Sequence, residues 1–531
     1  MMDLASLRGA TRELTARAVS AAQALTRDGE AIDDHQVVVE RVAYAATEAR
    51  VVEELAGAPA DIAPTAFVAA AELAASIAHR LAPVARALGL GEPRYPSEVA
   101  EVIAAGQAPE TVEAIGASVI AAGGRAPWPL EEVLAEIRAN VRAFAEREVA
   151  PHAERIHRHD ELVPERFIQE MAKLGYFGLS IPERYGGHEL GNLAMILTTE
   201  ELSRASLAAA GSLITRPEIL AKALLAGGTE EQKQTWLPRL ASGEVMAAIS
   251  VTEPNVGSDV AAVACRAERA AGGWTITGAK AWCTFAGRAD VIALLARTGD
   301  SARGLTLFGA RGLTLFIVDK PRFPGHAFEA RQPGGGTLIG KADRTPGYRG
   351  MHSFTLAFDR WWVPDAQVVG GEGGVGRGFP LQLAGFAAGR LQTGGRACGL
   401  LAAALEHTAR YVAERKQFMR PISDFGLTRY HVGQMAARLA AARAITYAAA
   451  AAMDRDERAA APVAAMAKLF ASDAAVEATQ LGQLLHGGWG YAEEYPISRC
   501  VVDAQVLPIF EGVKPILALK VIGRSLLGRS R

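Results

Sequence analysis

Hydrophobic positions recur at helical spacing along most of the first 240 residues. Within residues 1–122, apolar side chains such as Val42, Ala46 and Ala49 follow one another three or four positions apart, which is typical of a helix with one buried face. The stretch Gly123–Pro129 then interrupts the pattern with residues that disfavour helices. The chain is therefore expected to begin with a helical region that ends at a domain boundary.

A second helical domain is predicted over 130–244, because helical periodicity resumes after this break. From residue 245 the period changes to two. Trp274–Thr277 and Phe354–Asp359 alternate apolar with polar side chains, and Leu313–Val318 is a short apolar run. These patterns predict a β domain over 245–368.

After a glycine-rich loop, apolar residues return at spacings of three and four, which predicts a C-terminal helical bundle over 369–531. The strands are thus segregated from the helices, which argues against a doubly wound α/β fold. We expect an α+β protein that is mostly α, with a central β domain between two helical domains and an extra N-terminal helical domain.

The composition is that of an ordinary folded protein of several domains, with 531 residues, half of them apolar and 21% charged. Lys and Arg total 56 against 58 Asp and Glu, so the formal charge of -2 provides no basic field for nucleic acid. Four cysteines lie far apart without metal-ligand spacing. With no secretory signal and no long run of large apolar residues, a cytoplasmic protein without a membrane segment is expected.

Two local patterns favour ordinary structural roles. Gly371–Gly376 matches the letters of a dinucleotide loop, but it follows an antiparallel-type region rather than opening a βαβ unit. His152, His157 and His159 cluster near Asp160 with arginines between them, which is more typical of a solvated turn than of a metal site. The sequence therefore predicts no metal.

The most informative feature is a set of motifs spread over almost 400 positions. Each alone fits a turn, a core strand or a helix end. Together, in this order and spacing, they resemble the acyl-CoA dehydrogenase family over about residues 130–528. The motifs are Val251–Asp259, Lys280–Thr284, Glu414–Phe418, His486–Tyr491 and Ile509–Gly512.

The resemblance implies FAD as hydride acceptor and a carboxylate base, because removal of two hydrogens from an acyl-CoA needs both. The implied base is Glu511, with Phe510 giving it an apolar setting and Gly512 allowing a sharp turn and binding substrate. The alternative base position of some relatives is Gly389 here and cannot serve.

The remaining site residues also follow from the resemblance. Val251, Thr252, Trp282 and Thr284 are expected around the flavin ring, and Gly487 and Gly488 near FAD. Arg415 and Phe418 are expected to reach the FAD of a neighbouring subunit, and Ser258 to lie near both cofactor and CoA. Arg390 is expected to border the thioester.

Further stretches are similar to the branch of the family that acts on (2S)-methylsuccinyl-CoA, which also carries an N-terminal extension. They are Leu213–Ile219, Ala226–Lys233, Thr252–Asn255 and Gly347–Met351. The expected reaction is FAD-dependent 2,3-dehydrogenation of a short branched dicarboxylic acyl-CoA, here methylsuccinyl-CoA to mesaconyl-CoA. A buried carboxylate needs a partner, so Arg216 is the candidate that grips it and Arg349 the reserve. The competing interpretation is a surface Arg216 that pairs with Glu218 or caps a helix.

Three alternatives stay open: another acyl specificity, a flavin oxidase or monooxygenase, and a catalytically silent homologue that binds acyl-CoA or FAD. The resemblance also implies a homodimer or homotetramer, with an electron-transfer flavoprotein as acceptor. The chain departs from the family's usual pattern at Val513–Pro515, where a polar run is common, and at Leu484, where a glutamine is usual.

Overall fold

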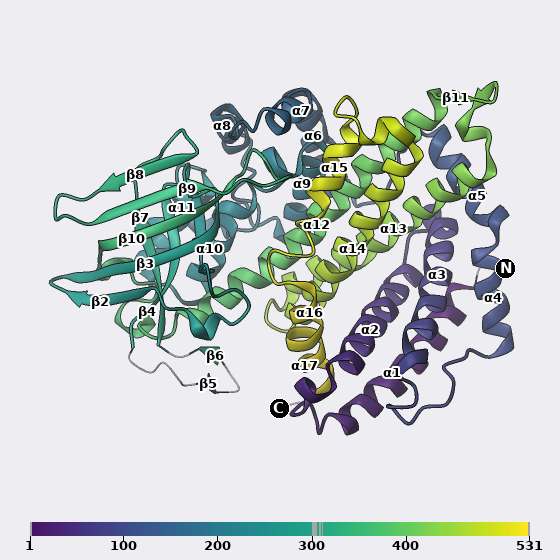
Figure 1. Ribbon diagram of the computed structural model, residues 1–531, viewed down its shortest axis with the longest axis horizontal. Helices are drawn as coiled ribbons and strands as arrows, with labels where there is room; N and C mark the ends of the chain where they lie inside the picture. Colours follow the sequence, from purple (N-terminus) through teal and green to yellow (C-terminus); the bar gives the residue numbers. More distant parts are fainter. Residues whose placement is uncertain (1–2, 300–304, 307–308, 311, 529–531) are drawn as a thin grey trace. The chain divides into compact units, whose positions relative to one another are not determined.

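The computed structural model describes residues 3–299, 305–306, 309–310 and 312–528 (Figure 1). The chain divides into two compact units, one formed by Met1–Asn140 with Thr393–Arg531 and the other by Val141–Gln392. With 61% helix and 13% strand, the structure confirms the mostly α, α+β class predicted from sequence.

The first unit is mostly helical. Its N-terminal helices are α1 (Leu4–Leu25), α2 (Gln36–Ala56), α3 (Ala63–Leu81), α4 (Ser97–Gln107) and α5 (Pro109–Ala121). Its C-terminal elements are β11 (Lys416–Gln417), β12 (Arg420–Pro421), α13 (Gly426–Arg455), α14 (Ala461–Leu485), α15 (Pro496–Ala504), α16 (Lys514–Ile516) and α17 (Arg524–Leu527). The division between the units falls inside α6 (Glu132–Phe144) and α12 (Gly378–Glu414).

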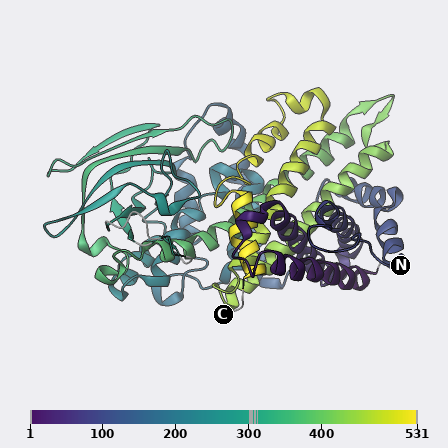
Figure 2. The same ribbon diagram turned by 60° about the horizontal axis from the view of Figure 1, so that its bottom comes forward.

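The N-terminal helices pack directly on the C-terminal ones, and both views show the purple helices beside green and yellow ones (Figures 1 and 2). Helix α5 approaches α13 so closely that a Cβ on Gly116 would lie 1.8 Å from the carbonyl oxygen of Arg429. Likewise, a Cβ on Gly433 would lie 2.2 Å from the carbonyl oxygen of Val112. Glycine is therefore required on both faces of this contact.

One hydrophobic core joins the two ends of the chain in this unit. Leu14, Val42 and Ile77 of the N-terminal helices share it with Leu519 and Leu527. The stretch Ala60–Val84 is long and apolar enough to cross a membrane by length and composition, but half of its most apolar window is buried inside the protein. Such burial is typical of a core helix.

The second unit combines helices with a sheet. Its elements are α7 (Ala150–Arg158), α8 (Glu165–Lys173), α9 (Gly191–Ala205), α10 (Thr215–Gly227), α11 (Glu230–Ala241), β1 (Ala247–Ser250), β2 (Arg266–Ala270), β3 (Gly273–Thr284), β4 (Val291–Arg297), β5 (Leu305–Thr306), β6 (Gly309–Ala310), β7 (Leu313–Asp319), β8 (Ala327–Arg331), β9 (Thr337–Ala342) and β10 (Ser353–Pro364). Among the described residues the main sheet runs β1-β4-β2-β3-β10-β9-β8, with β7 paired to β4. Most of its pairs are antiparallel, and β1 pairs with β4 in parallel.

A capping box fixes the start of α11. The Thr229 hydroxyl accepts a hydrogen bond from the Gln232 backbone N–H, and the Gln232 side chain accepts one from the Thr229 backbone N–H. The Gln232 amide also donates to the carbonyl of Val368, at 2.6 Å. The helix is thereby tied to the chain that follows β10.

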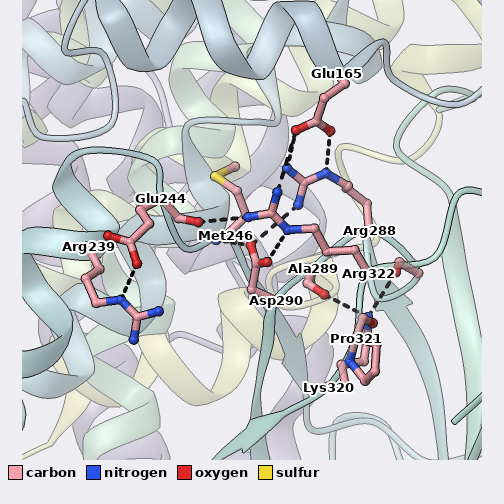
Figure 3. Close-up of polar contacts among 11 residues, drawn as sticks. Glu165, Arg239, Glu244, Met246, Arg288, Ala289, Asp290, Lys320, Pro321 and Arg322 are labelled. Carbon is pink, nitrogen blue, oxygen red and sulfur yellow. Dashed lines mark hydrogen bonds and ion pairs between the residues drawn. The ribbon is translucent and has the colours of Figure 1, made fainter.

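A polar network connects α8 to the sheet near the ends of β4 and β7 (Figure 3). The Arg288 guanidinium donates two hydrogen bonds to Glu165, at 2.5 and 2.6 Å, and Asp290 accepts from the backbone N–H of Met246 and from Arg322. The Lys320 ammonium donates to the carbonyls of residues 287, 289 and 321. Burial, together with the nearby arginines, lowers the pKa of Lys320 to about 7.

Candidate functional site

A buried ion pair holds the first two sequence motifs together. Lys280 of β3 is fully buried, and its ammonium donates to the carbonyl of Val251 and to a carboxylate oxygen of Glu253, each at 2.9 Å. The Glu253 carboxylate also accepts from the backbone N–H groups of Ala264 and Cys265, each at 2.9 Å. The segment after β1 therefore has a fixed position against β3.

We expect Glu253→Gln to lower the free energy of unfolding by about 2 kcal/mol, since the amide would turn donors towards backbone N–H groups and leave buried partners unsatisfied. Chemical denaturation followed by circular dichroism measures the change. The control is Lys341→Met, which removes an exposed charge from β9 of the same sheet and should cost less than about 0.5 kcal/mol. Equal stability of Glu253→Gln and wild type would show that the pair does not fix this segment.

A β-bulge presents the side chain of Trp282. The backbone N–H of Ala281 donates to the carbonyl of Thr252 at 2.9 Å, and the register between β3 and β10 shifts there. Trp282 has a φ of 59° and is 60% exposed, whereas Cys283 is buried. Bulges of this kind re-aim a side chain near functional sites. Burial raises the pKa of Cys283 to about 12, so this thiol is not a nucleophile.

Thr284 and Arg216 meet at the end of β3. The Thr284 hydroxyl lies 3.1 Å from that of Ser353, and the Thr284 carbonyl lies 3.4 Å from an Arg216 guanidinium nitrogen. Arg216 is in the first turn of α10, is only 4% exposed, and also donates to the carbonyl of Ser212. The interpretation of Arg216 as a surface residue is therefore wrong.

The structure also places the other predicted residues of this unit. Ser258 is exposed in the turn after Glu253, and Arg390 is half-buried on α12. The reserve candidate Arg349 donates to the carbonyls of Thr345 and His157 and lies 3.5 Å from Asp160. Arg349 therefore has a structural role in holding this loop.

In the helical unit, Glu511 lies in a tight turn before α16. Its φ is 54° and that of Gly512 is 99°, so both are in the left-handed region, which glycine adopts most easily. The buried Lys468 of α14 donates to the carbonyl of Gly512, and this contact holds the turn. Glu511 itself is half-buried.

Phe510, which is expected to give Glu511 an apolar setting, also has a charged neighbour. The guanidinium of Arg396, a fully buried residue of α12, lies 4.6 Å from the centre of the Phe510 ring. A cation over an aromatic face is a favourable contact, so the ring packs against charge. Hydrophobic spacing could not reveal this partner, because Arg396 precedes Phe510 by more than one hundred residues.

A short hairpin projects Phe418 and Met419 into solvent. Strands β11 and β12 are joined by these two residues, whose φ angles are 51° and 66° and whose exposed fractions are 88% and 99%. Two positive φ angles in a two-residue loop are typical of the type I′ hairpin. Large apolar side chains at such a tip are characteristic of a surface that another molecule covers. Arg415 is exposed at the base of this hairpin.

Three consecutive segments of the chain each match a different domain of the same protein family. The matches are to the acyl-CoA dehydrogenase N-terminal domain over 131–244, the middle domain over 248–361 and the C-terminal domain over 376–527. The chain belongs to the acyl-CoA dehydrogenase family. It is thus a flavoprotein oxidoreductase that acts on a CH–CH group.

Individual proteins and solved structures that are similar to this dehydrogenase agree with the family assignment. It is 39% identical over 438 residues to (2S)-methylsuccinyl-CoA dehydrogenase of Cereibacter sphaeroides, which covers 82% of this chain and 77% of the relative. The complex of glutaryl-CoA dehydrogenase with glutaryl-CoA matches with a TM-score of 0.66 and 30% identity, over 74% of this chain and 94% of the other. A chain in the structure described as the electron transferring flavoprotein of Acidaminococcus fermentans matches with a TM-score of 0.68 and 30% identity, over 76% and 99%.

The departure from the family's usual pattern at Val513–Pro515 has a physical explanation in the structure. Lys514, in the run Val513–Pro515, forms an ion pair with Asp473 of α14, and the Tyr44 hydroxyl of α2 donates to the same carboxylate at 3.3 Å. Burial raises the pKa of Asp473 above its usual range, against the lowering effect of Lys514. The N-terminal extension of this dehydrogenase therefore contacts the segment that directly follows Glu511.

The sequence could have indicated some of the residues that it missed. Lys468 stands in a long alanine-rich helix among apolar positions, and a lysine there is a candidate for a buried charge. Asp473 and Tyr44 carry no such signal, since their contact joins helices more than four hundred residues apart in the chain.

Proposed function

We propose that this dehydrogenase converts (2S)-methylsuccinyl-CoA to mesaconyl-CoA with FAD as cofactor. The observation that carries the substrate choice is the buried guanidinium of Arg216 beside Thr284. A buried arginine next to the strand assigned to the flavin can pair with the distal carboxylate of a dicarboxylic acyl group. The 39% identity to the methylsuccinyl-CoA enzyme supports the same substrate.

The residues present fit a flavin. The exposed Trp282 indole and the half-buried Thr284 hydroxyl stand beside the fixed backbone of Val251 and Thr252. In the helical unit, a Cβ added to Gly487 or Gly488 would meet nothing within 4 Å, which is the open backbone that a large cofactor needs. Arg415 and Phe418 are proposed to reach the FAD of a neighbouring subunit, and Gly487 and Gly488 to contact FAD.

In the proposed reaction, Glu511 accepts the proton from the carbon next to the thioester carbonyl. Its carboxylate is presented by the turn that Gly512 permits and Lys468 holds. Bound FAD supplies the hydride acceptor that no side chain provides. Arg216 grips the distal carboxylate, while Ser258 and Arg390 contact the CoA and thioester parts of the substrate.

The test is the absorption spectrum of the purified protein before and after anaerobic addition of methylsuccinyl-CoA. We expect the flavin band near 450 nm to bleach within the first turnover. A protein with flavin that does not bleach with any acyl-CoA would be a silent homologue, and rapid oxygen consumption during turnover would indicate an oxidase. An electron-transfer flavoprotein is the proposed acceptor, in keeping with the structural relative described above.

We expect the active form to be a homodimer or a homotetramer, because Arg415 and Phe418 are proposed to complete a neighbour's cofactor site. Phe418→Ser with Met419→Ser should weaken association and FAD retention by about 30-fold or more, the effect of losing an apolar interface anchor. Light scattering and flavin content measure both. The control Leu174→Ser changes an exposed leucine of α8's C-terminal end and should alter neither. A fully active FAD-bound monomer would contradict the assembly.

A further inference from the structure

Three metal-ligating side chains converge in the second unit, from segments far apart in the chain. Asp160 follows α7, His326 precedes β8 and His352 precedes β10. Nε2 of His352 lies 3.1 Å from Oδ1 of Asp160 and 3.2 Å from Nε2 of His326. All three ligand atoms lie within 4.8 Å of one another.

Hydrogen bonds within this cluster cannot satisfy all three side chains at once. If His352 Nε2 carries a proton, a single N–H must serve both Asp160 and His326; if it carries none, its lone pair faces the lone pairs of the Asp160 carboxylate. A cation between the three atoms would accept a lone pair from each. Two imidazoles and one carboxylate are a ligand set that Zn²⁺ and similar ions use.

The distances also suit an ion. Ligands at about 2.0–2.1 Å from a tetrahedral Zn²⁺ lie about 3.3 Å from each other. The distances from His352 Nε2 to Asp160 Oδ1 and to His326 Nε2, 3.1 and 3.2 Å, are close to that value.

The sheet fixes both histidines, and one side of the cluster is open to water. The carbonyl of His352 accepts from the Phe285 backbone N–H at 2.8 Å, and that of His326 from the Ala342 backbone N–H at 2.7 Å. His352 is buried while His326 is exposed, which gives an ion a path of entry. His352 and Asp160 both hold positive φ angles, 47° and 55°, in the left-handed region.

Arg349 opposes an ion, because its guanidinium lies 3.5 Å from the same Asp160 oxygen. That guanidinium also donates to the carbonyls of Thr345 and His157. These hydrogen bonds keep Arg349 in place when the Asp160 carboxylate binds an ion instead. Its charge should weaken the site rather than abolish it.

We propose that Asp160, His326 and His352 bind one divalent transition-metal ion of the zinc class, which joins the end of α7 to the sheet. The ion leaves at least one coordination position to water, since three protein ligands do not complete a tetrahedron. The sequence predicted no metal, and the histidines that it singled out, His152, His157 and His159, are not the ones that converge. The metal proposal is independent of the reaction proposed for Glu511.

The test uses the full-length FAD-bound protein without an affinity tag, freed of metal with EDTA and then desalted. Calorimetric titration with Zn²⁺ should show one site per chain, and Co²⁺ should add absorption bands above 550 nm, beyond the flavin. His326→Ala removes an exposed ligand without opening a core cavity and should weaken binding by ~100-fold or more. Added Zn²⁺ should raise the melting temperature of wild type but not of this variant, since a ligand of the native state stabilises it.

The matched control is His159→Ala, which removes an exposed histidine beside Asp160 and should bind Zn²⁺ like wild type. His326→Gln is the second variant, to be used if His326→Ala loses its flavin or if its circular dichroism spectrum shows that it has not folded. No binding by wild type at 100 µM Zn²⁺ would overturn the proposal. Equal binding by wild type and both His326 variants would overturn it as well.

Discussion

Glu511→Gln should bind acyl-CoA yet lose flavin reduction. General bases contribute about 10²–10⁴-fold to proton removal, and the amide cannot accept the proton. The variant keeps the size of the side chain and the positive φ of the turn, so Lys468 can still hold the carbonyl of Gly512. We expect the rate of anaerobic bleaching by methylsuccinyl-CoA in a single turnover to fall by at least ~10²-fold.

The control for this prediction is Glu494→Gln, which neutralises an exposed carboxylate of the same helical unit. It should bleach at the wild-type rate. Substrate binding is measured separately, from the shift of the flavin spectrum in the Glu511→Gln variant. Near-normal single-turnover bleaching in that variant would show that another group is the base.

The sequence predicts those parts of the fold that depend on local spacing. The period-two alternation of Phe354, Leu356 and Phe358 matches their burial on β10, and the helical spacing before residue 244 matches α7 to α11. Residues that depend on long-range contacts escape it. Lys280 and Glu253 pair across 27 positions, and no local pattern distinguishes them from surface charges.

The same limit applies to the sites. The motif around Trp282 and Thr284 is visible in sequence, but the bulge that exposes the indole depends on the register with β10. Asp160 and His352 are 192 positions apart, so only the folded chain brings them together. Sequence reasoning placed Asp160 among its neighbours in the chain, whereas its histidine partner comes from the sheet.

We expect Arg216 to decide the choice of substrate. Arg216→Met should lower kcat/KM for methylsuccinyl-CoA by ~10²–10³-fold, because a buried carboxylate that loses its charged partner costs about 3–5 kcal/mol. Activity on the neutral analogue 2-methylbutyryl-CoA should change little or rise, since that acyl chain has no charge to pair. The ratio of the two activities is the measurement, and it cancels any general loss of folded enzyme.

Arg349→Met is the matched control, because Arg349 holds Asp160 and two backbone carbonyls. It should lower stability and leave the ratio of the two activities unchanged. Arg216→Lys keeps the charge but loses the planar fork, so it should recover only part of the preference for the dicarboxylic substrate. Equal losses of kcat/KM on both substrates in Arg216→Met would show that Arg216, through its contact with the Thr284 carbonyl, has a purely structural role. A wild-type enzyme that prefers the neutral analogue would refute the dicarboxylate assignment while leaving the dehydrogenase reaction and Glu511 in place.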